Sequence, residues 1–118
     1  MSTSDLDLQR ERAARNQATL RSVNERIDGL SAVFQPDDNA QYVYVCECDD
    51  MSCLERIAIS HDEYRRVRRH PTEFFVVPGH ERPEVEEVVD QNSRWLVVRK
   101  IGVGATVATE LAQPRGER

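Results

Sequence analysis

The sequence predicts an α+β protein in which a long N-terminal helix precedes a small ββαβαβ domain with a mainly antiparallel four-stranded sheet. Two observations predict this class. An apolar stripe with helical spacing runs from residue 20 to residue 34 of the N-terminal segment, and short β-branched or aromatic runs alternate with capped helical segments from residue 41 to residue 101. Helices covering one face of the sheet are the natural packing for this order of elements.

The composition is typical of one small soluble domain with an extension. The chain has 118 residues, of which 39% are hydrophobic and 31% are charged. It lacks the run of about 20 apolar residues that a membrane helix needs, and its acidic N-terminal segment does not resemble a signal peptide. We therefore expect a cytoplasmic protein without a membrane partner. The net charge of −5 disfavours nonspecific attraction to a nucleic-acid backbone.

Residues 1–34 are predicted to form a helical arm. Ser4 is the expected cap, with Asp7 three residues later. The apolar stripe has alternating spacings of three and four, and consists of Leu20, Val23, Ile27, Leu30 and Phe34. Such a stripe either packs on its own domain or forms a coiled coil with a second copy or another protein.

Residues 35–40 are predicted to be a linker, and the first two strands follow it at 41–45 and 56–60 as a hairpin. Ser60 and Glu63 form a capping box, which predicts a helix over 61–69 that ends before Pro71.

The rest of the domain is predicted as strand, helix and strand. Residues 73–77 and 95–101 are the strands. Pro83 fits the first turn of a helix over 83–90 that would bury three valines. Residues 41–101 then form the domain, and residues 102–118 a flexible C-terminal tail.

All three cysteines of the chain lie within the segment from residue 46 to residue 53, with the pattern C-x-C-x₄-C. Thiols this close together in a reducing compartment indicate a metal site rather than disulfides. Zinc takes four ligands, so one imidazole is needed, and His80 is favoured because the rigid Pro78-Gly79 turn orients it. His61 is the second choice and His70 the third. The predicted zinc knuckle consists of Cys46, Cys48, Cys53 and His80.

The zinc is predicted to be structural. A closed Cys₃His set leaves no position for substrate, and neither the H-E-x-x-H motif nor the zinc-deaminase pattern occurs in the sequence. Buried apolar thiols are the alternative without a metal. We predict no catalytic residue, although a metalloenzyme stays an alternative.

A basic cluster on the helix at 61–69 consists of Arg65, Arg66, Arg68 and Arg69. Such a run is usually a solvated face neutralised by nearby acids, here expected on the helix at 83–90. Its alternative role is to contact an anion, a protein partner or RNA.

Residues 10–100 resemble a group of small actinobacterial proteins of unassigned activity. The resemblance rests on the C-x-C-x₄-C knuckle, an E-Y-x-x-V-R helix followed by Pro, and a P-G-H turn. It implies that the three cysteines and His80 act together. The sequence thus predicts a zinc-stabilised protein-interaction module, with a regulatory nucleic-acid or ribonucleoprotein binder as the alternative.

Overall fold

The computed structural model describes residues 4–34, 41–53 and 55–112 of the chain. The predicted linker 35–40, the end of the predicted tail at 113–118 and the side chain of Phe34 lie outside the described residues. Along the described part the elements are α1 (Asp5–Phe34), β1 (Gln41–Val45), β2 (Arg56–Ser60), α2 (His61–Arg68), β3 (Glu73–Val76), β4 (Glu86–Gln91), β5 (Leu96–Lys100) and α3 (Val103–Leu111).

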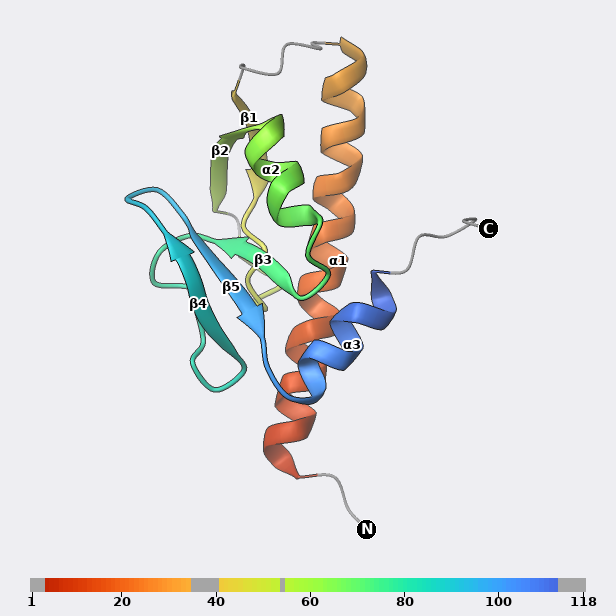
Figure 1. Cartoon of the computed structure of the whole chain (residues 1–118), viewed down its shortest axis with the longest axis vertical. Coiled ribbons are helices and arrows are strands. Elements are labelled where there is room, and N and C mark those ends of the chain that lie inside the picture. The colour runs from red at the N-terminus through yellow and green to blue at the C-terminus, as the bar shows by residue number, and fades with distance from the viewer. Residues whose placement is uncertain (1–3, 35–40, 54, 113–118) are drawn as a thin grey trace.

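The fold is α+β with a long N-terminal helix, as predicted, but the prediction of a single four-stranded sheet is wrong. The strands form two antiparallel sheets, a hairpin of β1 and β2 and a three-stranded sheet in the order β3-β5-β4 (Figure 1). The division has a physical reason. The chain enters α2 directly from β2 at the Ser60 cap, and the outer edge of β3 pairs with the segment after β1.

The predicted helix over 83–90 is also wrong, because residues 86–91 form the edge strand β4. Val85 is buried, while Val88 and Val89 are exposed. β4 and β5 form a hairpin around Asn92, whose Oδ1 accepts hydrogen bonds from the N–H groups of Arg94 and Trp95 at 2.8 and 2.9 Å. The β-branched residues and this Asn turn outweigh the helix-start signal of Pro83.

The predicted tail contains a helix, α3, which crosses α1 (Figure 1). A Cβ atom on Gly104 would lie 3.0 Å from the backbone oxygen of Arg10, so the two helices approach closely at this glycine. Val107 and Ala108 are buried in the same contact. Packing on α1 therefore stabilises a segment whose short side chains suggested a frayed end.

Two hydrophobic clusters lie on opposite faces of the three-stranded sheet. The cluster on the face toward α1 and α3 includes Phe74, Val76, Leu96 and Val98 of the sheet and Val107 and Ala108 of α3. The cluster on the opposite face includes Phe75, Trp95 and Val97, with Tyr64 and Val67 of α2 and Tyr42, Tyr44, Ile57 and Ile59 of the hairpin. Both tyrosines of β1 and the tryptophan are buried.

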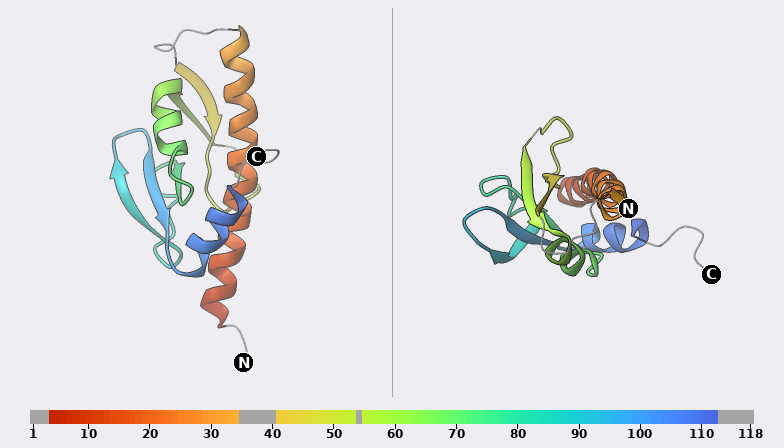
Figure 2. Two further views of the ribbon diagram at one scale, coloured as in Figure 1. Left: turned by 45° about the vertical axis from the view of Figure 1, so that its right-hand side comes forward. Right: turned by 90° about the horizontal axis from the view of Figure 1, so that it is seen from above.

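α1 runs beside β1 and α3 (Figure 2), and its predicted apolar stripe is only partly buried. Ile27 packs against the cluster formed by the hairpin and α2. Val23 is 43% exposed and Leu30 is 56% exposed. The buried side instead holds alanines and polar residues, namely Ala13, Ala14, Gln17, Ala18, Arg21 and Asn24. In the described part of the chain, no helix is both long enough and apolar enough to cross a membrane.

Candidate metal centre

The knuckle is the connection between the two strands of the first hairpin. The N–H of Cys46 donates to the carbonyl of Glu55 at 3.1 Å, which extends the hairpin by one step beyond β1. In the loop that follows, Asp50 Oδ1 accepts from the backbone N–H and hydroxyl of Ser52 at 2.9 and 2.7 Å, and the N–H of Cys53 donates to the carbonyl of Asp50 at 3.0 Å. This Asx turn reverses the chain and returns the third thiol toward the first two.

Four ligand atoms converge at the knuckle, and they belong to the four residues that the sequence predicted: Cys46, Cys48, Cys53 and His80. All four atoms lie within 4.8 Å of one another. His80 Nδ1 is 3.6 Å from the sulfur of Cys46 and 3.6 Å from that of Cys53. In a tetrahedral zinc site, bond lengths of about 2.3 Å to sulfur and 2.0–2.1 Å to nitrogen put those two atoms about 3.6 Å apart. The group is close enough to hold one metal ion.

His80 reaches the centre because the chain turns sharply after β3. Its N–H donates to the carbonyl of Val77 at 2.9 Å. Gly79 has a φ of +95°, and its N–H donates to the side chain of Glu81 at 2.8 Å. A left-handed residue at this point favours glycine. Of the other two histidines considered, His61 is buried and hydrogen-bonded elsewhere, to Tyr44 and Asp28, and His70 is exposed just after α2.

The knuckle backbone pairs with the outer edge of β3, which brings the cysteines beside the Pro-Gly-His turn. The N–H of Glu47 donates to the carbonyl of Phe75 at 3.0 Å, and the N–H of Phe75 donates to Glu47 Oε1 at 3.2 Å. Two residues later, the N–H of Val77 donates to the sulfur of Cys46 at 3.2 Å. Backbone donors to a cysteine sulfur orient the thiolate and stabilise its negative charge.

Three amide side chains of α1 hold the other side of the knuckle backbone. Asn16 Nδ2 donates to the carbonyl of Asp49 at 2.9 Å, and Gln17 Nε2 donates to the carbonyl of Glu47 at 2.8 Å. Asn24 accepts from the N–H of Val45 at 2.8 Å and donates to its carbonyl at 2.9 Å. The buried backbone groups beside the cysteines are thereby paired, as burial requires.

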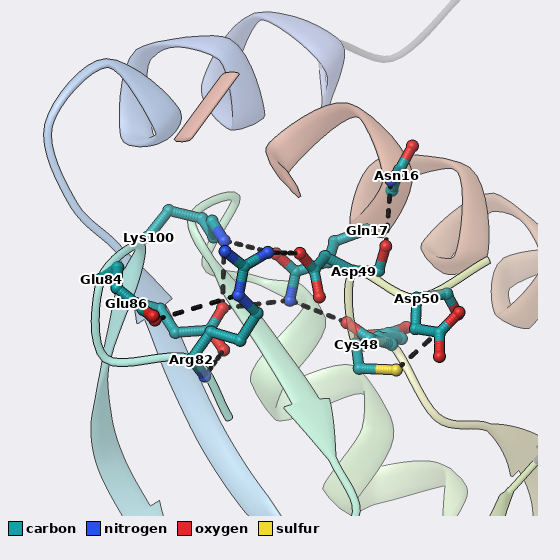
Figure 3. A network of polar contacts seen from close by, with 10 residues as sticks. Asn16, Gln17, Cys48, Asp49, Asp50, Arg82, Glu84, Glu86 and Lys100 are labelled. Atoms are coloured by element: carbon teal, nitrogen blue, oxygen red, sulfur yellow. Dashed lines mark hydrogen bonds and ion pairs between the residues drawn. The ribbon is translucent and has the colours of Figure 1, made fainter. Parts of the chain in front are cut away.

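A buried ionic network extends from α1 to β4 and β5 behind the knuckle (Figure 3). Lys100 Nζ donates to Glu86 Oε1 at 3.0 Å and to the side-chain oxygen of Gln17. Burial lowers the pKa of Lys100, and the neighbouring carboxylate of Glu86 opposes that shift. Arg82 joins the same network by pairing with Asp49 of the knuckle. The network fixes the knuckle relative to the three-stranded sheet.

A hydrogen bond between the thiols of Cys46 and Cys48 shifts their pKa values in opposite directions. The pKa of Cys48 is lowered to about 5, chiefly because it accepts a hydrogen bond from the thiol of Cys46, with further help from Asp50, His80 and Cys53. The same hydrogen bond and burial raise the pKa of Cys46. The lowered pKa favours the thiolate of Cys48, which is the form that binds a metal.

Comparison with protein families, with characterised proteins and with solved structures gives no match to this chain. The centre is interpreted from its own geometry.

Sequence reasoning missed the residues that position the knuckle, above all Asn16, Gln17 and Asn24. A signal was available in the sequence, because Gln17 and Asn24 are seven residues apart and share one face of the first helix. Amides repeated at helical spacing beside alanines indicate a face that binds backbone rather than apolar side chains.

Carboxylates of α1 partly neutralise the basic cluster of α2, in place of the acidic residues of 83–90 that were expected to pair with it. Arg65 Nε lies 3.2 Å from Asp28 Oδ2, and Arg68 pairs with Glu25. Arg66 is exposed on the same helix. The acids expected to neutralise the cluster lie on β4 and in the turn before it, because the predicted helix over 83–90 does not form. Two of the four arginines therefore connect α2 to α1.

Proposed function

We propose that the centre binds one zinc ion and that the ion is structural. The observation that supports this is the mutual spacing of the four ligand atoms, all within 4.8 Å. Three sulfurs and one imidazole nitrogen are a donor set that suits zinc or an iron–sulfur cluster. A cluster with two or more irons needs ligands spread around several metal ions, so this tight group fits a single ion better. His80 fills the fourth corner of a tetrahedron, which leaves no position for a reacting water.

The ion's role in the fold is to tie the loop of the first hairpin to the turn after β3. These two segments come from different sheets. A domain of this size buries a limited apolar core, and a metal ion commonly adds stability in such folds.

We further propose that the protein is an interaction module that binds a partner through the outer face of α1. That face carries an exposed stripe with spacings of three and four, made of Leu8, Arg12, Arg15, Thr19, Val23, Arg26 and Leu30. The stripe contains three arginines and no carboxylate of its own, although the whole chain has a net charge of −5. Arg15 pairs with Glu11 beside the stripe at 3.1 Å. Its chemistry fits a helix of another protein that presents apolar and acidic side chains. A second copy fits less well, since the stripe offers its own arginines no carboxylate.

A nucleic-acid partner is the second candidate. Exposed arginines on α1 and on α2 are the feature that favours it. Against it, Arg65 and Arg68 are already paired with carboxylates of α1, and three aliphatic side chains interrupt the basic stripe. A protein partner therefore agrees better with the exposed surface.

The metal proposal is tested by elemental analysis of the full chain purified without chelator. We expect about one zinc per chain, because the centre offers one set of four ligands. Cys48→Ser should lose the zinc. Met51→Ser is the matched control, because Met51 is in the same loop and 50% exposed, and it should keep the metal. A Cys48→Ser protein that retains stoichiometric zinc contradicts the proposal.

The partner proposal is tested by copurification from the native host with two charge-reversal variants. Arg12, Arg15 and Arg26 are changed to Glu in one, and Arg66 and Arg69 in the other. Loss of one defined protein partner in the first variant only supports the α1 interface. Salt-dependent retention on RNA or DNA that is lost in the second variant supports the nucleic-acid alternative.

A further inference from the structure

We propose that the knuckle is also a site of oxidative modification: hydrogen peroxide oxidises Cys53, and a disulfide between Cys53 and Cys48 then releases the metal. The inference rests on the proposed metal-binding function and adds a chemical reaction to the same site. It follows from three features of the cluster, namely the unequal access of solvent to its sulfurs, their proximity and the different anchoring of Cys46 and Cys48.

Solvent reaches the three sulfurs unequally. Cys46 is 1% exposed and Cys48 is 2% exposed, whereas Cys53 is only partly buried. Cys53 lies two residues after Met51, an exposed side chain of the same loop. Zinc holds all three cysteines as thiolates, so their access to solvent decides which one peroxide oxidises. A small oxidant arriving from solvent therefore meets Cys53 first.

A second thiol is within reach of the oxidised one. All the ligand atoms lie within 4.8 Å of one another, so a small displacement brings two sulfurs to the bond length of about 2.05 Å. A thiol this close condenses with a sulfenic acid before further oxidation occurs, which is the usual arrangement at cysteines that respond to oxidants.

The anchoring of the two buried thiols favours Cys48 as the partner. Cys46 is fixed on both sides, because its N–H donates to the carbonyl of Glu55 and its sulfur accepts from the N–H of Val77. The sulfur of Cys48 instead makes a long contact of 3.9 Å to the carbonyl of Asp50, and Cys48 begins the irregular loop that ends at Cys53. A disulfide between these two residues closes a loop whose ends belong to neither β1 nor β3.

The reaction balances with hydrogen peroxide as the only oxidant. The Cys53 thiolate attacks one peroxide oxygen, which breaks the O–O bond and gives a sulfenic acid and one hydroxide. The Cys48 thiolate then attacks the Cys53 sulfur, the S–O bond breaks, and a disulfide and a second hydroxide form. Solvent protonates both hydroxides to water. Two thiolates lose two electrons and one peroxide gains them. Only Cys46 and His80 stay available as ligands, which is too few to retain the ion.

The experiment uses the full chain, with its zinc content measured first. The protein is treated with stoichiometric hydrogen peroxide while a chromogenic chelator reports free zinc, and dimedone traps sulfenic acid at early times. We expect one zinc released per disulfide formed, a dimedone adduct on Cys53 first, and a Cys48–Cys53 linkage in peptide maps made without reductant. Dithiothreitol plus zinc should restore the starting state.

Met51 supplies an internal measure of peroxide exposure, since its sulfoxide is seen in the same peptide maps. The Met51→Leu variant should release zinc as the wild type does, which shows that methionine oxidation is not the cause. Cys53→His keeps a ligand in place of the thiol and should retain zinc under peroxide.

The inference is overturned if zinc stays bound when Met51 is fully oxidised, or if the first adduct lies on Cys46 or Cys48. A disulfide that joins Cys46 instead of Cys48 overturns the assignment of the partner thiol. Failure of the proposed function looks different, since the untreated protein then contains no zinc, whatever peroxide does to its thiols.

Discussion

Asn24→Ala is the substitution that best tests how the knuckle is held. Asn24 is fully buried on α1 and makes three hydrogen bonds to the segment that carries the first two cysteines. Two of them pair both backbone groups of Val45, at 2.8 and 2.9 Å, and the third reaches Glu47 Oε2 at 2.8 Å. Alanine removes all three and leaves their partners buried.

The magnitude follows from these contacts. Each bond to Val45 is between neutral groups and contributes about 0.5–1.5 kcal/mol, and the bond to the Glu47 carboxylate contributes about 1.5–3 kcal/mol. The free energy of unfolding should therefore fall by about 2.5–6 kcal/mol. That is a large fraction of the 5–15 kcal/mol that is typical of small proteins.

The measurement is urea unfolding of the zinc-loaded protein, with Asn16→Ala as the matched control. Asn16 is on the same helix and makes a single, part-buried bond to the carbonyl of Asp49, so its loss should cost about 1 kcal/mol. A free energy of unfolding for Asn24→Ala within experimental error of that for Asn16→Ala would falsify the view that α1 fixes the knuckle through Asn24.

Two further predictions concern buried positions near α1. Burial raises the pKa of Glu47 to about 7, above its value near 4.5 in the unfolded chain, so the stability that its protonated form contributes is present below pH 4.5 and lost as the pH rises through 7. The free energy of unfolding of Glu47→Gln should therefore rise by about 2–3 kcal/mol relative to that of the wild type between pH 5 and pH 8. Urea unfolding at saturating zinc measures this at several pH values, and a difference between the two proteins that does not change with pH contradicts the prediction. Gly104→Ala puts a Cβ 3.0 Å from the backbone oxygen of Arg10 and should lower the unfolding free energy by about 1–3 kcal/mol. Gly29→Ala in α1 is the control, since nothing lies within 4 Å of the added atom, and it should raise the unfolding free energy by about 0.5–1 kcal/mol. Thermal melts in which both variants gain stability would refute the close approach of α1 and α3.

The group of four residues that could hold a metal ion could be predicted from sequence because its signals are local. Three thiols within one turn and a histidine fixed by Pro78-Gly79 are chemical constraints that short segments carry by themselves. The Ser60 cap of α2 is predictable for the same reason, and both of its hydrogen bonds form. The route by which His80 reaches the cysteines was not predictable, because it depends on Glu47 pairing with the distant edge of β3.

β4 shows how local signals conflict. Pro83 and the acidic residues after it fit the start of a helix, while the valines that follow favour a strand. The conflict is resolved by a partner, since residues 86–91 pair with β5 across the Asn92 turn. The sequence alone favours the helix, because the edge of β5 with which these residues pair is a feature of the tertiary structure.

α1 reverses the usual rule that the apolar face of a helix is the buried one. That rule holds where the surface beneath the helix is made of side chains, but here much of it is the backbone of the knuckle, which carries N–H and C=O groups. An apolar face laid on that backbone would leave those groups unpaired at a cost of about 1–3 kcal/mol each, whereas Gln17 and Asn24 pair them. The residues that look most suited to burial, Val23 and Leu30, are thereby displaced to the surface. Because the amide face of α1 is the buried one, α1 both positions the knuckle and leaves the stripe on its other side exposed.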